Sequence, residues 1–467
     1  MNKHLWKGEQ VLEIIKGHGP SNWKASGVSI DTRTLRKGDI FFALAGPNYD
    51  GHQFISSAIK KGASAIISNA PSLEFKEKVV IVNDVLKSLV SLGKFSRKRN
   101  NGKIIAITGS SGKTTVKEMS ALLLNKFGKI HYSEASYNNK IGVSLSLARM
   151  PADADFSIFE LGMNQSGEIS YLSNLVKPHV ALVNNVGSAH IGYLKSKKEI
   201  EKAKIEILDG LALNGKLILN DSISLTSDHK KNLIKKNIEI LKFGYKKNSD
   251  LILKKYKYFP NLSVVDAIVN SLKISYSLKS PGEHMAINSI AVLGICHSLD
   301  IECNLVTKTF SDFEAIDGRG KIYNLSIMGK KLQVIDESYN ANPESTESSI
   351  KLLSEIDFLK SKRKLLILGD MMELGNFSKD MHTEMASFIN YSDIDLVYCL
   401  GTEVKNLWEN LINEKKGFYS KETQVLANYL INQIKENDLI LLKGSSQSGI
   451  KDIFDLLKVE KLKRNIA

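Results

Sequence analysis

The segment Ile104–Thr115, IIAITGSSGKTT, constrains the fold of this chain more than any other dozen residues. An apolar run typical of a β-strand ends at a Gly-Ser-Ser-Gly turn, and Lys113 then leads into a segment with helical periodicity. A strand, a glycine turn and a helix in this order predict an α/β fold with ligands at the carboxyl end of the strand. The apolar positions of the predicted helix are Val116, Met119, Leu123 and Phe127.

The same turn has the chemistry of a phosphate-binding loop. Backbone N–H groups of such a turn, and the N-terminus of the following helix, hold polyphosphate oxygens. Lys113 is expected to reach the β- and γ-phosphates of ATP, and the Thr114 hydroxyl to bind Mg²⁺. The general pattern has a glycine where Ile107 stands, so the spacing here is the shorter TGxxGKTT. The predicted phosphate-binding residues are Gly109, Ser110, Ser111, Gly112, Lys113, Thr114 and Thr115.

Length and composition predict a cytoplasmic protein of several domains. A chain of 467 residues is long enough for about three domains. Its three cysteines form no CxxC pair, so we expect reduced thiols. The N-terminal sequence lacks the apolar region of a signal peptide, and no apolar run approaches the length of a membrane span. No exposed apolar heptad indicates obligate assembly, so we expect a monomer.

The net charge of +14 admits two interpretations. Nucleic acid is one candidate partner for such a surface. The other interpretation, which we favour, is a solvated lysine-rich surface that also attracts small anionic substrates. No zinc finger or aromatic RNA-binding motif accompanies the charge, so we expect no nucleic-acid partner.

Changes along the sequence divide the chain into three predicted domains, 1–99, 100–317 and 318–467. The basic link SRKRNNGK separates the first two, and Gly318 begins the third. The first contains a strand-like run at Ala65–Ser68. In the second and third, strands alternate with helical patterns, which favours parallel sheets. The predicted strands are Ile104–Thr108, Phe156–Leu161, Val180–Val186, Leu332–Ile335, Lys364–Leu368, Asp395–Leu400 and Leu439–Leu442.

Two strands of the second domain end in groups suited to a metal ion beside the phosphate loop. The first ends at Glu160, and the second leads to His190. A carboxylate and a neutral imidazole next to bound phosphates predict a second Mg²⁺ site, although Mg²⁺ usually prefers oxygen ligands. The helical segment that follows carries Lys202 and Lys204, which composition alone indicates to be solvated surface lysines.

Together these motifs resemble those of the Mur ligases. The resemblance rests on TGSSGKTTVKEM, SYNNKIG, ELGMNQSGEI, SAHIGYLKSKKEIEKAKIEIL, DESYNANPES, GDMMELG and KGS, and on SIDTR, GDIFFAL and DGHQF near the N-terminus. It covers nearly the whole chain. It implies an N-terminal UDP-sugar-binding α/β domain, a central P-loop ATP-binding domain with a mostly parallel sheet, and a C-terminal Rossmann-like α/β domain.

The resemblance also assigns roles to individual residues. The implied catalytic residues are Lys113, His190, Lys204 and Arg319. The implied metal ligands are Thr114, Glu160, His190 and Lys204, the last as a CO₂-derived carbamate. The implied nucleotide-binding residues beyond the loop are Asn288, Arg319 and a ribose-binding carboxylate, either Asp336 or Glu337. The implied substrate-binding residues are Ser29, Thr32, Arg33, Asp50 and His52 for uridine diphosphate, Asn138 and Asn139 for the muramoyl group, and Tyr339, Asn340 and Asn342 for the incoming dipeptide.

Four positions depart from the family pattern. His284-Met285 replaces an HN pair, and Glu337 replaces an aspartate two residues before the YNANP tyrosine. Ser144 replaces a proline, and Ser446 replaces an arginine in the KGSR motif. None of the four lies in the phosphate loop or among the predicted metal ligands.

The activity implied by the resemblance is ATP-dependent amide ligation with ATP and Mg²⁺ as cofactors. The YNANP and GDMMELG motifs indicate the branch that adds D-alanyl-D-alanine to UDP-N-acetylmuramoyl-tripeptide through an acyl phosphate, for peptidoglycan synthesis. Two alternatives stay open at this point. One is a related ligase that uses another amino acid or a folate, and the other is a basic P-loop ATPase that binds nucleic acid.

Overall fold

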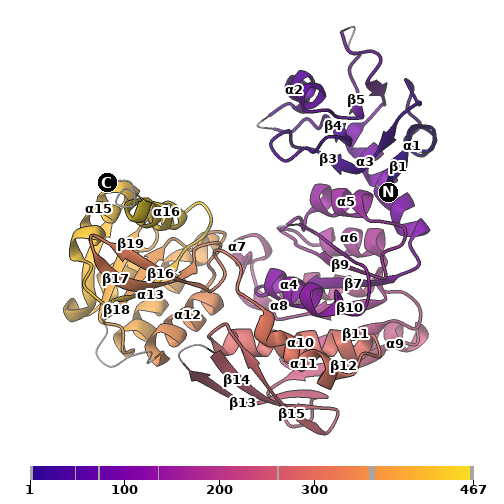
Figure 1. Cartoon of the computed structure of the whole chain (residues 1–467). Coiled ribbons are helices and arrows are strands. Elements are labelled where there is room, and N and C mark those ends of the chain that lie inside the picture. The colour runs from indigo at the N-terminus through magenta and orange to yellow at the C-terminus, as the bar shows by residue number, and fades with distance from the viewer. Residues whose placement is uncertain are drawn as a thin grey trace.

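Three lobes follow one another along the chain (Figure 1). The computed structural model describes residues 4–47, 49–71, 74–134, 136–259, 262–356 and 363–462. The N-terminal lobe stacks on the central lobe, and the C-terminal lobe lies beside the central lobe. Each of the three main sheets falls within one of the predicted domains, whose exact boundaries stay a prediction.

The N-terminal lobe is built on a four-stranded parallel sheet in the order β3-β4-β5-β6. Strand β5 spans the predicted residues, Ala65–Ser68. The elements are β1 (Trp6–Lys7), α1 (Gly8–Ile15), β2 (Lys24–Ala25), β3 (Gly27–Ser29), β4 (Asp39–Phe42), η1 (Gly51–Phe54), α2 (Ile55–Lys60), β5, β6 (Val79–Ile81) and α3 (Val85–Arg99).

The central lobe holds a nine-stranded sheet in the order β15-β14-β13-β12-β11-β10-β7-β9-β8. Strands β7 to β13 are parallel to one another, whereas β14 pairs antiparallel with both β13 and β15. Its elements are β7 (Lys103–Thr108), α4 (Lys113–Leu124), β8 (Ile130–Tyr132), α5 (Lys140–Arg149), β9 (Phe156–Glu160), α6 (Glu168–Val176), β10 (Val180–Val183), α7 (Ile191–Leu194), α8 (Lys197–Ile205), η2 (Glu206–Leu208), β11 (Lys216–Asn220), α9 (Ser227–Lys235), β12 (Glu239–Gly244), β13 (Leu251–Phe259), β14 (Leu262–Val269), β15 (Leu272–Leu278), α10 (Glu283–Ser298), α11 (Cys303–Thr307) and η3 (Lys308–Asp312).

Strand order explains where the predicted site lies. Strand β7 runs between β9 and β10, and all three are parallel. Because the carboxyl ends of parallel strands meet at one edge of a sheet, the phosphate loop, Glu160 and the segment after β10 come together there. Residues 104–108 are buried throughout, as expected for a strand covered by helices on both faces.

Some sequence expectations for this lobe were wrong in detail. Helix α4 ends at Leu124, so Phe127 lies beyond the helix and is exposed. Strand β10 ends at Val183, three residues earlier than expected, because the chain turns there to enter the nucleotide site. The antiparallel strands β14 and β15 were not anticipated, although the buried side chains of β14 alternate along the strand.

The C-terminal lobe has a six-stranded sheet in the order β16-β17-β21-β18-β19-β20. Only the β16/β17 pair is antiparallel. The four strands predicted here correspond to β17, β18, β19 and β21. The elements are β16 (Lys321–Ile327), β17 (Lys330–Glu337), α12 (Pro343–Glu355), β18 (Lys364–Gly369), η4 (Gly375–Phe377), α13 (Ser378–Asn390), β19 (Leu396–Leu400), α14 (Lys405–Asn410), η5 (Asn413–Lys415), β20 (Lys416–Ser420), α15 (Thr423–Gln433), β21 (Leu439–Lys443) and α16 (Ile450–Leu462).

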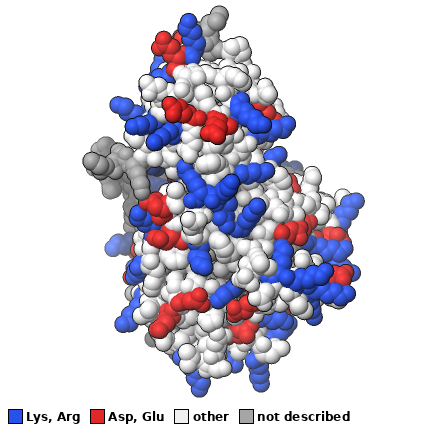
Figure 2. All heavy atoms as spheres, turned by 90° about the vertical axis from the view of Figure 1, so that its right-hand side faces the viewer, with Lys and Arg blue, Asp and Glu red and all other residues white. Residues whose placement is uncertain are grey.

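Side chains of β1 and α3 join the N-terminal lobe to the central lobe. The Arg99 guanidinium lies 3.8 Å from the centroid of the buried Trp6 ring, and the Trp6 indole N–H donates to the Ala148 carbonyl at 2.9 Å. Arg97 donates to the Val176 carbonyl at 2.7 Å. These arginines therefore act as internal contacts rather than as a free cationic surface. On the face shown in Figure 2, basic and acidic side chains are interspersed.

Candidate active site

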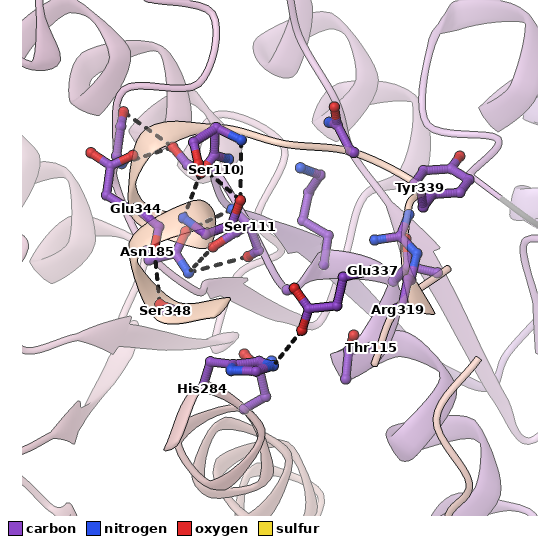
Figure 3. Close-up of a pocket in the computed structure, with 18 of the residues that line it drawn as sticks. Ser110, Ser111, Thr115, Asn185, His284, Arg319, Glu337, Tyr339, Glu344 and Ser348 are labelled. Atoms are coloured by element: carbon purple, nitrogen blue, oxygen red, sulfur yellow. Dashed lines mark hydrogen bonds and ion pairs between the residues drawn. The ribbon is translucent and has the colours of Figure 1, made fainter. Parts of the chain in front are cut away.

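A cavity of about 920 Å³ lies between the central and C-terminal lobes (Figure 3). The central lobe lines it with the phosphate loop, the end of β9, the segment after β10 and the start of α10. The C-terminal lobe contributes the chain from Gly318 to α12 and the loop after β21. The shape of this cavity therefore depends on how the two lobes are positioned relative to each other.

The phosphate loop has the geometry that anion binding requires. Gly112 has φ +77°, a left-handed conformation that glycine adopts without strain, and α4 begins at the next residue. A Cβ on Gly112 would lie 2.5 Å from the amide nitrogen of Asn184 and 2.6 Å from the amide oxygen of Asn288. The glycine therefore allows both asparagines to approach the loop. The N–H of Ser111 donates to the Asn185 side chain at 2.9 Å.

Lys113 lies at the mouth of this loop. Its Nζ donates to the Gly109 carbonyl at 2.7 Å and thus curls back over the turn. Burial lowers the pKa of Lys113, while the Glu160 carboxylate opposes that shift. A bound polyphosphate would stabilise the ammonium form further, because its negative charge would lie next to this amine.

Glu160 is a buried carboxylate with 2% of its surface exposed. Its two oxygens accept hydrogen bonds from the Thr114 hydroxyl at 2.7 Å and from the Asn138 amide at 2.8 Å. A hydroxyl and a carboxylate beside a phosphate loop are the oxygen donors with which proteins hold Mg²⁺, the phosphates and water completing its shell. The donor set therefore fits the expected ion. Within the described residues, no group of three or more His, Cys, Asp or Glu forms a separate metal cluster.

His190 is the residue before α7, and Lys204 lies on α8. His190 has φ +68°, and its Nδ1 is 2.7 Å from Oε2 of Glu373 in the C-terminal lobe. Lys204 is 2% exposed, unlike Lys202, whose Nζ is 2.6 Å from Glu199 on the surface. Burial, and secondarily the nearby Lys113, lowers the pKa of Lys204 well below its usual value. The expectation of a solvated lysine was thus wrong for Lys204, and a neutral amine is the form that reacts with CO₂.

Arg319 and Tyr339 mark the junction of the two lobes. The Arg319 guanidinium lies 4.0 Å from the Tyr339 ring centroid, and its Nη2 donates to the Ser136 hydroxyl at 3.1 Å. Both residues line the cavity, as do Asn340 and Asn342 of the YNANP segment. Asn342 also caps α12 by accepting a hydrogen bond from the Ser345 N–H at 2.9 Å.

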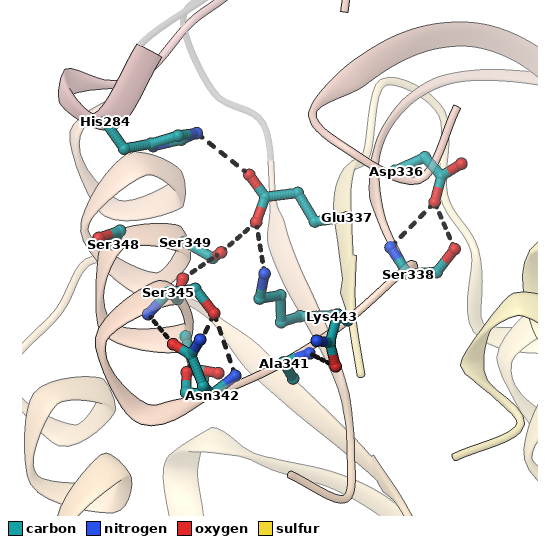
Figure 4. A network of polar contacts seen from close by, with 12 residues as sticks. His284, Asp336, Glu337, Ser338, Ala341, Asn342, Ser345, Ser348, Ser349 and Lys443 are labelled. Carbon is teal, nitrogen blue, oxygen red and sulfur yellow. Dashed lines mark hydrogen bonds and ion pairs between the residues drawn. The ribbon is translucent and has the colours of Figure 1, made fainter. Parts of the chain in front are cut away.

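The two candidate ribose carboxylates differ in position (Figure 4). Asp336 accepts hydrogen bonds from the Gly318 and Ser338 backbone N–H groups and is absent from the cavity lining. Glu337 lines the cavity, 3.1 Å from Nζ of Lys443 and 3.6 Å from Nε2 of His284. Burial raises the pKa of Glu337, but Lys443 and His284 outweigh burial, so that the pKa lies below its usual value.

Several predicted residues lie apart from this cavity. Asn139 caps α5 by accepting from the Gly142 N–H at 2.9 Å. The five predicted uridine-diphosphate residues lie in the N-terminal lobe, where Arg33 pairs with Asp31 and the Asp50 carboxylate contacts the His52 imidazole. Gly109, Lys204 and Asp336 are also outside the lining residues. The other predicted central and C-terminal site residues line the cavity.

Sequence reasoning missed several lining residues. Glu373 lies within the quoted GDMMELG motif and Glu344 within DESYNANPES, so their motifs could have identified them. Tyr245, Tyr256 and Tyr258 line one end of the cavity. Tyr245 follows β12, and Tyr256 and Tyr258 lie on β13, where no motif indicated a site.

Comparisons with known proteins agree with this architecture. Residues 24–99 match the Mur ligase family catalytic domain, 107–296 the Mur ligase middle domain, and 319–446 the Mur ligase glutamate ligase domain. A UDP-N-acetylmuramoyl-tripeptide–D-alanyl-D-alanine ligase of Rickettsia prowazekii is 33% identical, over 97% of this chain and 99% of the relative. The Escherichia coli protein of the same name is 29% identical, over 96% and 97%.

Solved structures show the same fold. A crystal structure of MurF from Acinetobacter baumannii superposes with a TM-score of 0.84 and 25% identity, covering 97% of this chain and 99% of that one. MurF from Thermotoga maritima, solved in complex with ADP, has a TM-score of 0.78 at 24% identity, covering 94% and 98%. The three-domain α/β fold predicted from the sequence is therefore confirmed. With matches in all three lobes and a relative of this identity along nearly its whole length, the chain belongs to the Mur ligase family.

Proposed function

We propose that this chain is the ATP-dependent ligase that joins D-alanyl-D-alanine to UDP-N-acetylmuramoyl-tripeptide in peptidoglycan synthesis. The observation that carries the proposal is the interlobe cavity, in which a phosphate loop faces the YNANP segment. Relatives that carry the name of this ligase match the chain from end to end. A related ligase with a folate substrate, or a nucleic-acid-dependent ATPase, would not account for that match.

The loop and the residues around it would bind ATP. Residues 109–115 would hold the phosphates through backbone N–H groups and the Lys113 ammonium. Asn288 would contact the adenine, and Arg319 would reach the phosphates from the lobe junction. Of the two carboxylates, Glu337 is the one we propose for the ribose, because it faces the cavity whereas Asp336 is committed to backbone N–H groups.

We propose that Mg²⁺ is held by Thr114 and Glu160 at a first position and by Glu160, His190 and carbamylated Lys204 at a second. The burial of Lys204 supports the carbamate, since a neutral amine adds CO₂ and becomes an anionic oxygen ligand. Bound Mg²⁺ would neutralise charge on the transferring phosphoryl group.

The reaction then has two steps. The tripeptide carboxylate attacks the γ-phosphorus, so that an acyl O–P bond forms and the bond to the β-phosphate oxygen breaks, releasing ADP. The amine of D-alanyl-D-alanine next attacks the acyl carbon, loses a proton and expels inorganic phosphate as the amide forms. Lys113 and Arg319 place positive charge beside the phosphoryl oxygens during the first step.

The other substrate groups are assigned from the family motifs. We propose that Ser29, Thr32, Arg33, Asp50 and His52 bind uridine diphosphate, and that Asn138 and Asn139 face the muramoyl group. Tyr339, Asn340 and Asn342 would contact the dipeptide. The proposal includes a cytoplasmic monomer with domains at 1–99, 100–317 and 318–467. Among the residues that the structure describes, every helix is too short or too polar to cross a membrane.

A phosphate-release assay tests the function directly. We expect phosphate from ATP only when UDP-N-acetylmuramoyl-tripeptide and D-alanyl-D-alanine are both present, together with a pentapeptide product detected by mass spectrometry. Release that depends on polynucleotide, or product formed with another amino acid in place of the dipeptide, would overturn the proposal.

A further inference from the structure

The segment from Gly187 to Gly192 joins β10 to α7 and carries His190 into the cavity. It belongs to the central lobe, yet two carboxylates of the C-terminal lobe, Glu344 and Glu373, hold it. His190 has a left-handed backbone, which a non-glycine residue keeps only when its surroundings enforce it. Within the central lobe its carbonyl accepts the Tyr193 and Leu194 N–H groups, and the C-terminal lobe adds contacts on both sides of it.

Glu344 contacts one end of the segment. Its two carboxylate oxygens accept the Ser188 backbone N–H at 2.8 and 2.9 Å, and Oε1 also accepts the Ser188 hydroxyl at 2.9 Å. Nζ of Lys197 lies 3.0 Å from the same oxygen. Burial raises the pKa of Glu344, but these donors outweigh it and the pKa is lowered, so the carboxylate is ionised at neutral pH. Figure 3 shows Glu344 together with Ser110 among the residues that line the cavity.

Glu373 contacts the other end. Its side chain lies 2.7 Å from Nδ1 of His190, and its backbone carbonyl accepts the Gly192 N–H at 3.0 Å. The contact lacks the geometry of a hydrogen bond, so Glu373 orients the His190 imidazole by electrostatic attraction rather than by a directed hydrogen bond.

Two glycines make the close approach possible. A Cβ on Gly187 would lie 2.7 Å from the Glu344 carboxylate, and a Cβ on Gly192 would lie 2.7 Å from the Gly375 backbone nitrogen. Backbone atoms cannot yield as a flexible side chain does. A side chain at position 192 would therefore force the lobes apart.

We propose that Glu344 and Glu373 are positioning residues that fix the 187–192 segment, and hence His190, only when the C-terminal lobe closes on the central lobe. Closure then completes the nucleotide site from both sides. This inference rests on the proposed function for its catalytic consequence, whereas the contacts themselves are independent of turnover.

Hydrogen exchange of the full chain, measured both without ligands and with a non-hydrolysable ATP analogue, tests the contacts. The Ser188 and Gly192 amides donate across the lobe boundary, so a peptide covering 186–194 reports on them. Glu344→Gln keeps the shape but removes charge-assisted hydrogen bonds, and we expect about tenfold to a hundredfold faster exchange at Ser188. Gly192→Ala should push the lobes apart, so that the backbone amides at positions 188 and 192 both exchange faster. The matched control is Glu347→Gln, an exposed glutamate on the same helix, which should leave the peptide unchanged.

Steady-state ligation tests the positioning role. Because the contacts form on closure, Glu344→Gln should lower kcat about tenfold while the KM for ATP changes less than about twofold. Unchanged exchange in Glu344→Gln and Gly192→Ala would overturn the proposed contacts. Faster exchange with an unchanged kcat would overturn the positioning role. If the wild-type protein shows protected amides but no ligation, the proposed function fails and the contacts stand.

Discussion

The buried pair Glu337–Lys443 gives a prediction whose size follows from the structure. Both side chains are 7% exposed and lie 3.1 Å apart, and Ser349 donates a hydrogen bond to the same carboxylate oxygen. Lys443→Met fills a similar volume but leaves a desolvated carboxylate without its cation. Removal of one partner of a buried pair costs about 3–5 kcal/mol. For a lobe of this size, that corresponds to a fall in melting temperature on the order of 10 °C.

The pH dependence of this loss of stability tests whether the unpaired Glu337 carboxylate causes it. In the wild type the pKa of Glu337 is lowered, so its stabilisation is present above the unfolded pKa of about 4.3 and is lost as pH falls through the folded pKa. In Lys443→Met we expect burial to outweigh the remaining His284, so that the pKa of Glu337 rises above its unfolded value. The ionised carboxylate then destabilises the fold most at neutral pH, and its protonation removes this destabilisation as pH falls toward 5.

Differential scanning calorimetry at pH 7 and pH 5 measures both effects. The difference in melting temperature between wild type and Lys443→Met should shrink at pH 5, and Lys443→Met/Glu337→Gln should recover much of the loss at pH 7. Lys451→Met, an exposed lysine on α16, is the control. A difference that is equal at both pH values, or a double variant as unstable as the single one, would refute the reasoning.

Three further predictions concern the nucleotide site and the lobe junction. Lys113→Ala should abolish ATP-dependent joining while circular dichroism stays that of the wild type, because the ammonium charge at the phosphates is lost; retained turnover would contradict its role. Lys204→Ala should be inactive and partly rescued by short carboxylic acids that supply the missing anion, as measured by phosphate release, whereas full activity of the variant would exclude the carbamate. Arg99→Met should destabilise the N-terminal lobe by about 1–2 kcal/mol through loss of the contact with Trp6, as measured by thermal unfolding, with Lys98→Met as the control; equal melting temperatures for both variants would contradict it.

The sequence by itself determined the local chemistry. The apolar run into Gly-Ser-Ser-Gly-Lys-Thr specified strand β7, the loop and the start of α4, because each of those elements is set by residues within one turn or one strand. Motif resemblance extended this to the family and to residues such as Glu160, which the structure places against Thr114. Strand β5 and four of the six strands of the C-terminal sheet, β17, β18, β19 and β21, followed from the same short-range patterns, whereas β16 and β20 were not anticipated.

Only the tertiary structure decided which groups meet and in what state. Lys202 and Lys204 are two residues apart on one helix, yet one is solvated and the other is buried beside Lys113. Asp336 and Glu337 are adjacent, and β-strand alternation sends one to backbone N–H groups and the other into the cavity. The contacts of Glu344 and Glu373 with the 187–192 segment join residues more than 150 positions apart. Such contacts depend on how two lobes pack, and no local pattern encodes that packing.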